Sequence, residues 1–454
     1  MYWRVVVPLA VALAVTAGAV FIAVDRDNST SHPAGHAAAP VATRSPVLAA
    51  LDAAAPPPAK AAVSSALAPV LREFPSGEQV SGTVVDVASG TPLWARAAHR
   101  PAAPASTLKL LTAAAALRVL GPGFTFATTV RLVGDTVYLV GGGDPTLAVS
   151  ASKADVPASY PKPASLTDLA QQTAAALEPP AQRVRVRVDT SMWSGPQLAE
   201  GWSAGYVTEG DVTPPSALEL DGGRLRPAEF DSPRTPDPAM QAGATFAALL
   251  RRDGVSVRGV AKPAVAPQTS EELATVASPP LSSLVQRMLT DSDNDLAEAL
   301  GRAVALHDHL PPTFAGAADA VRNEVAALGV PAAAVSLHDT SGLSHLDMVQ
   351  PAALVAVLRS ATADPTLRPV IEGLPTAGFT GTLADRYRGK SRSPGAGLVR
   401  AKTGSLTGVN SLAGLVVDGS GRLLAFAFMG SGTTQTDAVQ TDLDAAASAL
   451  VALS

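Results

Sequence analysis

Residues 101–122 read PAAPASTLKLLTAAAALRVLGP, and this stretch decides how the rest of the chain is interpreted. The part before Ser106 contains two prolines and disfavours a helix. The part that follows, up to Leu117, has apolar residues at helical spacing until a Gly-Pro pair ends the pattern. We therefore expect Ser106 at or near the N-terminus of a buried helix, with Lys109 one turn further along the same face.

A serine and a lysine at this spacing can form a nucleophile and its base. A serine hydroxyl is a weak nucleophile near neutral pH, and a lysine can take its proton if burial lowers the pKa of the ammonium group. The N–H groups at a helix N-terminus also favour a developing oxyanion. The spacing is common on helices, however, and by itself it is far more often a capping serine beside a solvated lysine.

A second motif, Ser292-Asp293-Asn294, lies between two apolar segments of helical spacing. These residues are ordinary turn and cap residues, so the motif alone is weak. Its position predicts a short polar break between two buried helices.

The third motif, Lys402-Thr403-Gly404, lies in a predicted strand that begins at Val399. A predicted hairpin follows, with apolar runs at 412–417 and 423–428 around Asp418-Gly419-Ser420-Gly421. We expect Lys402 to provide a fixed positive charge for a carboxylate and Thr403 a hydroxyl donor beside it. Gly404 would allow a substrate backbone to approach the strand edge closely.

The three motifs in this order are the signature of β-lactamases and penicillin-binding proteins. The chain resembles the D-alanyl-D-alanine carboxypeptidase/endopeptidase branch of the low-molecular-mass penicillin-binding proteins, the class C type-4 group. The stretches Gly142–Leu147, Thr340–Ser344 and Gly381–Leu383 are also similar to that family, and the resemblance extends from about Ala61 to the end.

The resemblance implies an α+β fold, a penicillin-binding transpeptidase-like domain with a five-stranded antiparallel sheet, flanking helices and a helical lobe that carries Ser292. It implies hydrolysis of the D-Ala-D-Ala bond of peptidoglycan stem peptides through an acyl-enzyme, with β-lactam antibiotics as covalent inhibitors. Endopeptidase action on cross-links stays open beside carboxypeptidase action. No cofactor and no metal is implied.

The same resemblance assigns roles to eight residues. Ser106 would be the nucleophile, Lys109 its base, and Ser292 the route of a proton to the leaving group. Asn294 would orient the substrate amide, and Lys402, Thr403, Gly404 and Ser405 would bind the substrate. The backbone N–H groups of Ser106 and Ser405 would form the oxyanion hole.

The segment between the first two motifs is longer than a helical subdomain requires. We assign residues 61–145 and 279–454 to the catalytic domain and residues 146–278 to a large α/β insertion, whose signals include a helix at 166–177 and a strand at 184–189. Because all the motifs lie outside the insertion, we expect its replacement by a short linker to leave acylation by penicillin intact.

The composition of the chain excludes several kinds of partner and site. The chain has 454 residues with 47% hydrophobic content, enough for two or three cores, and its net charge of -5 without a polybasic block argues against nucleic acid. The absence of cysteine excludes disulfides, thiolate metal sites and a cysteine nucleophile. We interpret His307-Asp308-His309 as a solvated loop rather than a metal site.

The N-terminus indicates an extracytoplasmic protein. Residues 5–24 are apolar and free of charge, so residues 1–24 form either an uncleaved anchor in the cytoplasmic membrane or a signal peptide. Residues 25–60 are rich in Pro and Ala without periodicity and are expected to form a flexible linker.

Two other functions stay open. A β-lactamase carries the same motifs but needs a fast deacylating base, such as the glutamate of class A enzymes, and we identify none in the sequence. A penicillin-binding sensor module would keep the fold without turnover.

Overall fold

The structure is a computed structural model that describes residues 51–52, 54–73, 79–150, 161–177, 183–432 and 436–453. The apolar segment expected at residues 1–24 and most of the linker expected at residues 25–60 lie outside these ranges. Among the described residues, no helix is both long enough and apolar enough to span a bilayer.

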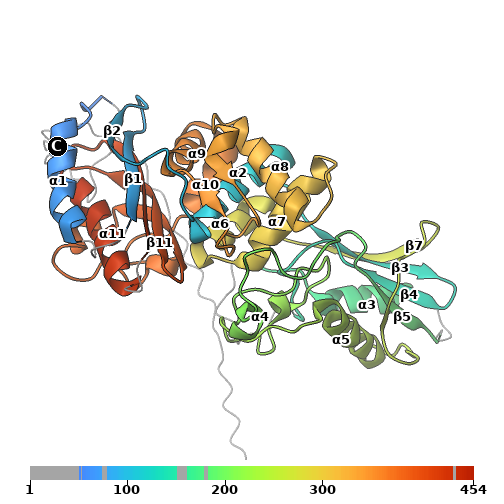
Figure 1. Ribbon diagram of the computed structural model, residues 1–454. Helices are drawn as coiled ribbons and strands as arrows, with labels where there is room; N and C mark the ends of the chain where they lie inside the picture. The colour runs from blue at the N-terminus through green and yellow to red at the C-terminus, as the bar shows by residue number, and fades with distance from the viewer. Residues whose placement is uncertain are drawn as a thin grey trace, which may run out of the picture. The chain divides into compact units, whose positions relative to one another are not determined.

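The first sheet has five strands in the order β10-β11-β12-β1-β2, and every neighbouring pair is antiparallel (Figure 1). The strands are β1 (Gln79–Asp86), β2 (Pro92–Arg96), β10 (Val399–Leu406), β11 (Val409–Val417) and β12 (Leu423–Ser431). The chain's first and last strands therefore pair, and the predicted five-stranded antiparallel sheet is confirmed. The predicted hairpin forms between β11 and β12, where Asp418 Oδ1 accepts hydrogen bonds from the backbone N–H groups of Ser420 at 2.9 Å and Arg422 at 2.8 Å.

Helices cover both faces of this sheet. Strand β12 places Phe426 and Phe428 on one face, in a core with α1 (Lys60–Glu73) and α11 (Thr436–Val451). It places Ala425 and Ala427 on the other face, in a core with α2 (Lys109–Leu120) and α9 (Pro351–Ala363). The alternation follows from the two-residue period of a strand.

The core that contains Ala425 and Ala427 continues into a helical lobe around α2. Its other helices are α6 (Leu281–Asp291), α7 (Asn294–His307), α8 (Phe314–Ala326) and α10 (Arg368–Glu372). Short 3-10 turns and strands complete the list: η1 (Ala105–Leu108), η2 (Asp221–Gly223), η3 (Ala332–Ala334), η4 (Pro365–Leu367), η5 (Gly381–Leu383), η6 (Ser393–Gly395), β8 (Val335–Ser336) and β9 (Met348–Val349). Ser292 lies between α6 and α7, so the predicted polar break between two buried helices is confirmed.

A second, mixed sheet has its own core. Its order is β6-β5-β4-β3-β7, formed by β3 (Ala127–Val133), β4 (Thr136–Val140), β5 (Arg185–Asp189), β6 (Lys262–Pro263) and β7 (Glu271–Ala277). The pairs β4–β5 and β5–β6 are parallel, and the chain passes between their members through α3 (Leu166–Ala176) and α5 (Pro238–Arg252). These two helices pack on the same side of the sheet (Figure 1). The short helix α4 (Tyr206–Glu209) lies in the long segment between β5 and α5.

The sheet of the insertion starts earlier than the sequence indicated. Strands β3 and β4 precede residue 146 and pair with β7 and β5, so the predicted boundary at residues 145 and 146 divides the strands of one sheet. An alternating pattern in the sequence predicts a strand but does not show which of two sheets the strand joins. We propose that the insertion begins just before Ala127.

The end of the expected linker packs on the catalytic domain. The backbone N–H of Asp52 donates to the carbonyl of Gly421 at 2.9 Å, and Arg422 Nη1 donates to the carbonyl of Ala55 at 2.9 Å. These contacts attach the chain to the domain before α1 begins. Any flexible linker therefore ends near residue 50 rather than residue 60.

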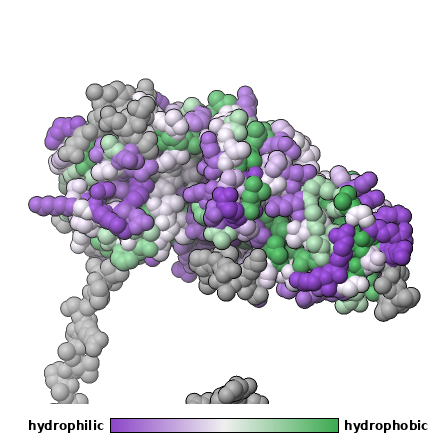
Figure 2. Space-filling view, turned by 90° about the horizontal axis from the view of Figure 1, so that it is seen from below, coloured by the Kyte–Doolittle hydropathy of each residue, from purple (hydrophilic) through white to green (hydrophobic). Residues whose placement is uncertain are grey.

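One face of the molecule is drawn in Figure 2. Hydrophobic residues on it are interrupted by hydrophilic ones. Scattered apolar residues are normal on protein surfaces. Apolar character does not mark a docking surface on this face.

Candidate active site

Ser106 lies in the 3-10 turn η1 that leads directly into α2, so the predicted position near a helix start is confirmed. The residue before it, Ala105, has a φ of 48°, a conformation that costs free energy for a residue with a side chain and is often found at functional sites. The carbonyl of Pro104 accepts hydrogen bonds from Thr107 Oγ1 at 2.7 Å and from Ser411 Oγ at 2.6 Å. The side chain of Thr107 and strand β11 thus hold the turn that presents Ser106.

Lys109 is fully buried, and its ammonium nitrogen has three oxygen neighbours. Nζ lies 3.0 Å from Ser106 Oγ, 2.6 Å from Asn294 Oδ1 and 2.6 Å from the carbonyl of Ser341. Burial lowers the pKa of Lys109 to about 8, against the opposing charges of Asp339 and other carboxylates. A lysine with this pKa is partly neutral near pH 8 and can accept the proton of Ser106.

Ser292 and Asn294 come from the break between α6 and α7. Ser292 ends α6 with a φ of 62°, and Asp293 caps α7 by accepting a hydrogen bond from the backbone N–H of Leu296 at 3.0 Å. The side chain of Asn294 then lies between two partners. Its Oδ1 accepts from Lys109, and its Nδ2 donates to the carbonyl of Asp211 at 2.8 Å.

Lys402 lies on β10, an edge strand of the first sheet, and it is fully buried. Its Nζ donates to Ser292 Oγ at 2.9 Å and to the carbonyl of Thr403 at 3.0 Å. Burial and then the charge of Lys109 hold the pKa of Lys402 well below its usual value. Lys402 therefore contacts Ser292 directly, and its expected role as a positive charge for a substrate carboxylate stays a prediction.

Gly404 lies in close contact with other parts of the protein. A Cβ atom at this position would lie 2.3 Å from Ser411 Oγ and 2.7 Å from the carbonyl of Pro104. The missing side chain lets β10 pack against the turn before Ser106. The expected approach of a substrate backbone to Gly404 stays a prediction.

The remaining predicted residues lie further along the same strand. Thr403 Oγ1 is 2.8 Å from Thr382 Oγ1. Ser405 is exposed, donates from Oγ to Asn410 Oδ1 at 3.2 Å and accepts from Gln440 Nε2 at 3.0 Å. Its assignment to an oxyanion hole stays a prediction.

The structure thus brings the predicted residues together in two hydrogen-bonded groups. One consists of Ser106, Lys109 and Asn294, and the other of Ser292, Lys402 and the Thr403 carbonyl. The two groups are linked through the break between α6 and α7, where Ser292 and Asn294 are two residues apart.

Sequence reasoning missed several groups that complete the site. Ser341 and Thr382 belong to stretches that resemble the family, but no role was assigned to them. Asp211 acts through its backbone carbonyl, which no side-chain pattern reveals.

Asp339 is a further missed residue, and it shapes the turn that carries the Ser341 carbonyl. It is fully buried, and its Oδ1 accepts from the backbone N–H groups of Ser341 at 3.0 Å and Gly342 at 2.6 Å. Its Oδ2 accepts from the backbone N–H of Ser344 at 2.7 Å and from Trp202 Nε1 at 2.7 Å. Trp202 belongs to the insertion.

The insertion therefore reaches the site through two contacts, the Asp211 carbonyl on Asn294 and the Trp202 indole on Asp339. The expectation that a linker could replace residues 146–278 without effect on acylation is revised, because that replacement removes both contacts.

Among the described residues, no group of three or more His, Cys, Asp or Glu is arranged to hold a metal ion. His307 Nδ1 lies 2.9 Å from Asp308 Oδ1.

The chain is similar to several known proteins. The profile of the D-Ala-D-Ala carboxypeptidase 3 (S13) family matches residues 63–233 and 231–452. The chain is 37% identical over 442 residues to carboxypeptidase DacB of Mycolicibacterium smegmatis, covering 96% of this chain and 93% of that protein. It is 31% identical over 428 residues to a D-alanyl-D-alanine carboxypeptidase of Actinomadura sp., covering 78% of each.

A solved structure has the same fold. Penicillin binding protein 4 of Haemophilus influenzae matches with a TM-score of 0.68 at 22% identity, over 84% of this chain and 97% of that chain. The structure of that protein has also been determined in complex with a β-lactam, and this second structure covers the same 84% and 97% with a TM-score of 0.65 at 20% identity.

Replacement by arginine should affect acylation differently at the two buried lysines, Lys109 and Lys402. Lys109→Arg should abolish acylation by benzylpenicillin, because a guanidinium stays protonated and cannot act as a base. Lys402→Arg keeps a positive charge beside Ser292 and should retain part of the rate. Stopped-flow acylation kinetics would measure both, with the exposed Lys390→Arg as a control that should match the wild type. Equal losses at Lys109 and Lys402, with circular dichroism showing intact folds, would contradict this division of roles.

Proposed function

The chain belongs to the D-Ala-D-Ala carboxypeptidase 3 (S13) family, and we propose that it removes the terminal D-alanine from peptidoglycan stem peptides through an ester on Ser106. The observation that carries this proposal is the contact of Ser106 Oγ with Lys109 Nζ, in surroundings that lower the pKa of the lysine to about 8. This contact supplies a serine nucleophile with a base that can be neutral near physiological pH.

Acylation would begin when Ser106 Oγ gives its proton to Lys109 and attacks the carbonyl carbon between the last two D-alanines. The N–H groups of Ser106 and Ser405 would stabilise the oxyanion of the tetrahedral intermediate. The proton that Lys109 has taken would then pass through Ser292 to the leaving amine, which leaves Lys109 neutral again for deacylation; the contact of Ser292 with Lys402 supports a role for Ser292 in this transfer. The terminal D-alanine then leaves, and the shortened stem peptide stays on Ser106.

Deacylation would reverse these proton movements. Water attacks the ester carbonyl while Lys109 takes a proton from it, and that proton returns to Ser106 Oγ as the ester breaks. The free enzyme and the shortened peptide are the products.

The terminal carboxylate of the substrate would lie beside β10. Thr403 and Thr382 offer two adjoining hydroxyls there, and the charge of Lys402 lies behind them. This arrangement differs from a direct lysine–carboxylate contact. It follows from the burial of Lys402 against Ser292.

Rapid hydrolysis of β-lactams needs a carboxylate or another base free to activate water on the acyl-enzyme. Each of the four carboxylates whose charges act on Lys109 already accepts hydrogen bonds from other groups. Asp339 accepts from backbone N–H groups and Trp202, and Glu298 accepts from Arg302 and Thr340. Asp293 accepts from Arg287 and Leu296, and Asp295 accepts from Arg234 and Thr213. None of these four is available for that task. We therefore favour a peptidase, inhibited by β-lactams, over a β-lactamase.

Release of free D-alanine tests the function. The protein should release D-alanine from a pentapeptide that ends in D-Ala-D-Ala, and Ser106→Ala should release none. Benzylpenicillin should give one stable adduct, found on the peptide that contains Ser106, because none of the four carboxylates that act on Lys109 is free to activate water. A folded protein without D-alanine release would favour the sensor module, and rapid penicillin turnover would favour the β-lactamase. Cross-linked muropeptides in the same assay would show the share of endopeptidase action.

We also propose that the enzyme acts outside the cytoplasmic membrane, where its polymeric substrate is assembled. Residues 5–24, which lie outside the described residues, would direct it there as an anchor or a signal peptide.

Cell fractionation would check this placement. The protein should be recovered with the membrane or the cell envelope, and removal of residues 1–24 should leave it in the cytosol. Full-length protein recovered from the cytosol would contradict the proposed location.

A further inference from the structure

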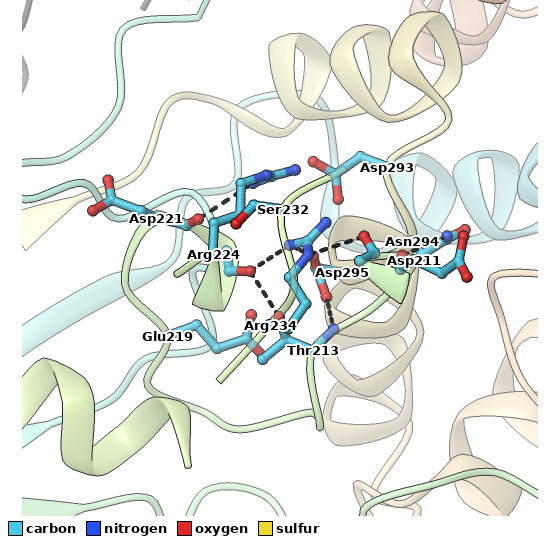
Figure 3. Close-up of polar contacts among 12 residues, drawn as sticks. Asp211, Thr213, Glu219, Asp221, Arg224, Ser232, Arg234, Asp293, Asn294 and Asp295 are labelled. Atoms are coloured by element: carbon cyan, nitrogen blue, oxygen red, sulfur yellow. Dashed lines mark hydrogen bonds and ion pairs between the residues drawn. The ribbon is translucent and has the colours of Figure 1, made fainter. Parts of the chain in front are cut away.

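A buried ion pair joins the insertion to the first turn of α7 (Figure 3). Arg234 Nη1 lies 2.9 Å from Asp295 Oδ2, and only 4% of each side chain is exposed. Burial and the charge of Asp295 raise the pKa of the neighbouring Glu219 well above its usual value. Asp295 is the carboxylate that contacts Arg234 directly.

The pair also holds the loop of the insertion that carries it. Arg234 donates from Nε to the carbonyl of Gly210 at 3.0 Å and from Nη1 to the carbonyl of Gly222. Asp295 Oδ1 accepts from the backbone N–H of Thr213 at 2.7 Å, and Thr213 Oγ1 donates to the carbonyl of Gly222 at 2.7 Å. One carboxylate on α7 thus fixes the loop on both sides of Asp211.

Asp211 is the residue that touches the site. Because Gly210 and Thr213 are both held, the carbonyl between them has a defined position, 2.8 Å from Asn294 Nδ2. In Figure 3, Asp211 and Asn294 lie beside each other, next to Asp295. A carbonyl oxygen can only accept a hydrogen bond, so it fixes the amide of Asn294 with Nδ2 toward the insertion and Oδ1 toward Lys109.

The orientation of Asn294 decides what Lys109 can do. A neutral lysine amine has two hydrogens and one lone pair. Two of its three neighbours, Asn294 Oδ1 and the Ser341 carbonyl, can only accept and so take both hydrogens. The lone pair is left for the third neighbour, Ser106 Oγ, whose proton it must receive.

We propose that Arg234 and Asp295 are positioning residues for the acylation step, which aim the lone pair of Lys109 at Ser106 through the Asp211 carbonyl and Asn294. The inference rests on the proposed function, since it needs Lys109 to be the base. It gives the insertion a part in catalysis on small substrates, in addition to any part in docking polymer.

The test compares two variants with a matched control. Arg234→Met combined with Asp295→Asn removes the pair without leaving a buried charge, and an asparagine can still accept from the Thr213 N–H. Thr213→Val is milder and removes only the hydroxyl that holds Gly222. Arg226→Met is the control, because it removes an exposed arginine of the same loop that pairs with exposed Glu229.

The second-order rate constant for acylation by benzylpenicillin would be measured from pH 6 to pH 10, together with the final fraction of protein labelled. The double variant should label completely, but its plateau rate at high pH should fall by about tenfold to a hundredfold, because the lone pair is no longer aimed. The midpoint of its pH profile should move to lower pH, since Asp295 is one of the charges that raise the pKa of Lys109, with Asp339, Glu298 and Asp293. Thr213→Val should lose about fivefold, the effect of one hydrogen bond, and Arg226→Met should match the wild type.

A purely structural clamp would give a different result. In that case the double variant would have a lower melting temperature, and a smaller fraction of the protein would be labelled. The protein that is labelled would keep the plateau rate and the pH midpoint of the wild type. That result, or a wild-type profile in the double variant, would overturn the proposal. If the double variant does not fold, an unchanged plateau rate in Thr213→Val would do the same. A wild-type protein that penicillin does not acylate would refute the proposed function itself.

Discussion

The buried amine of Lys109 is the group on which the site depends. Burying a charged lysine is costly unless acceptors and opposite charges surround it. Here three oxygens contact Nζ, and Asp339, Glu298, Asp293 and Asp295 act on it by charge. The balance lowers the pKa of Lys109 without removing its hydrogen bonds, so the amine can be neutral and still be held in place.

Those surroundings come from distant parts of the chain and meet at the start of α7. Four consecutive residues there have four different partners. Ser292 contacts Lys402, Asp293 caps the helix, Asn294 links Lys109 to the insertion, and Asp295 binds Arg234. A change in the insertion can therefore reach the nucleophile over a short path of hydrogen bonds, without movement of either sheet.

The sequence predicted those parts of the fold that have local signals. The turn at residues 418–421, the helix after Ser106 and the break at Ser292 were each placed by turn residues and apolar periodicity. The sequence did not predict where the second sheet begins, because a strand pattern does not show which sheet the strand will join. The motifs also predicted which residues would gather but not what each would face. Gly404 packs on Pro104, Lys402 contacts Ser292, and Asp211 contributes only its backbone.

The central claim is that Lys109 is a buried base with a lowered pKa, and NMR titration of the lysine side chains measures this directly. The seven lysines of the chain can be labelled with nitrogen-15 at Nζ, and the signal of Lys109 assigned by its loss in Lys109→Arg. We expect that signal to titrate at about pH 8. A midpoint near 10.5, the usual value for lysine, would contradict the account, because Lys109 would then stay protonated at the pH at which the enzyme must work.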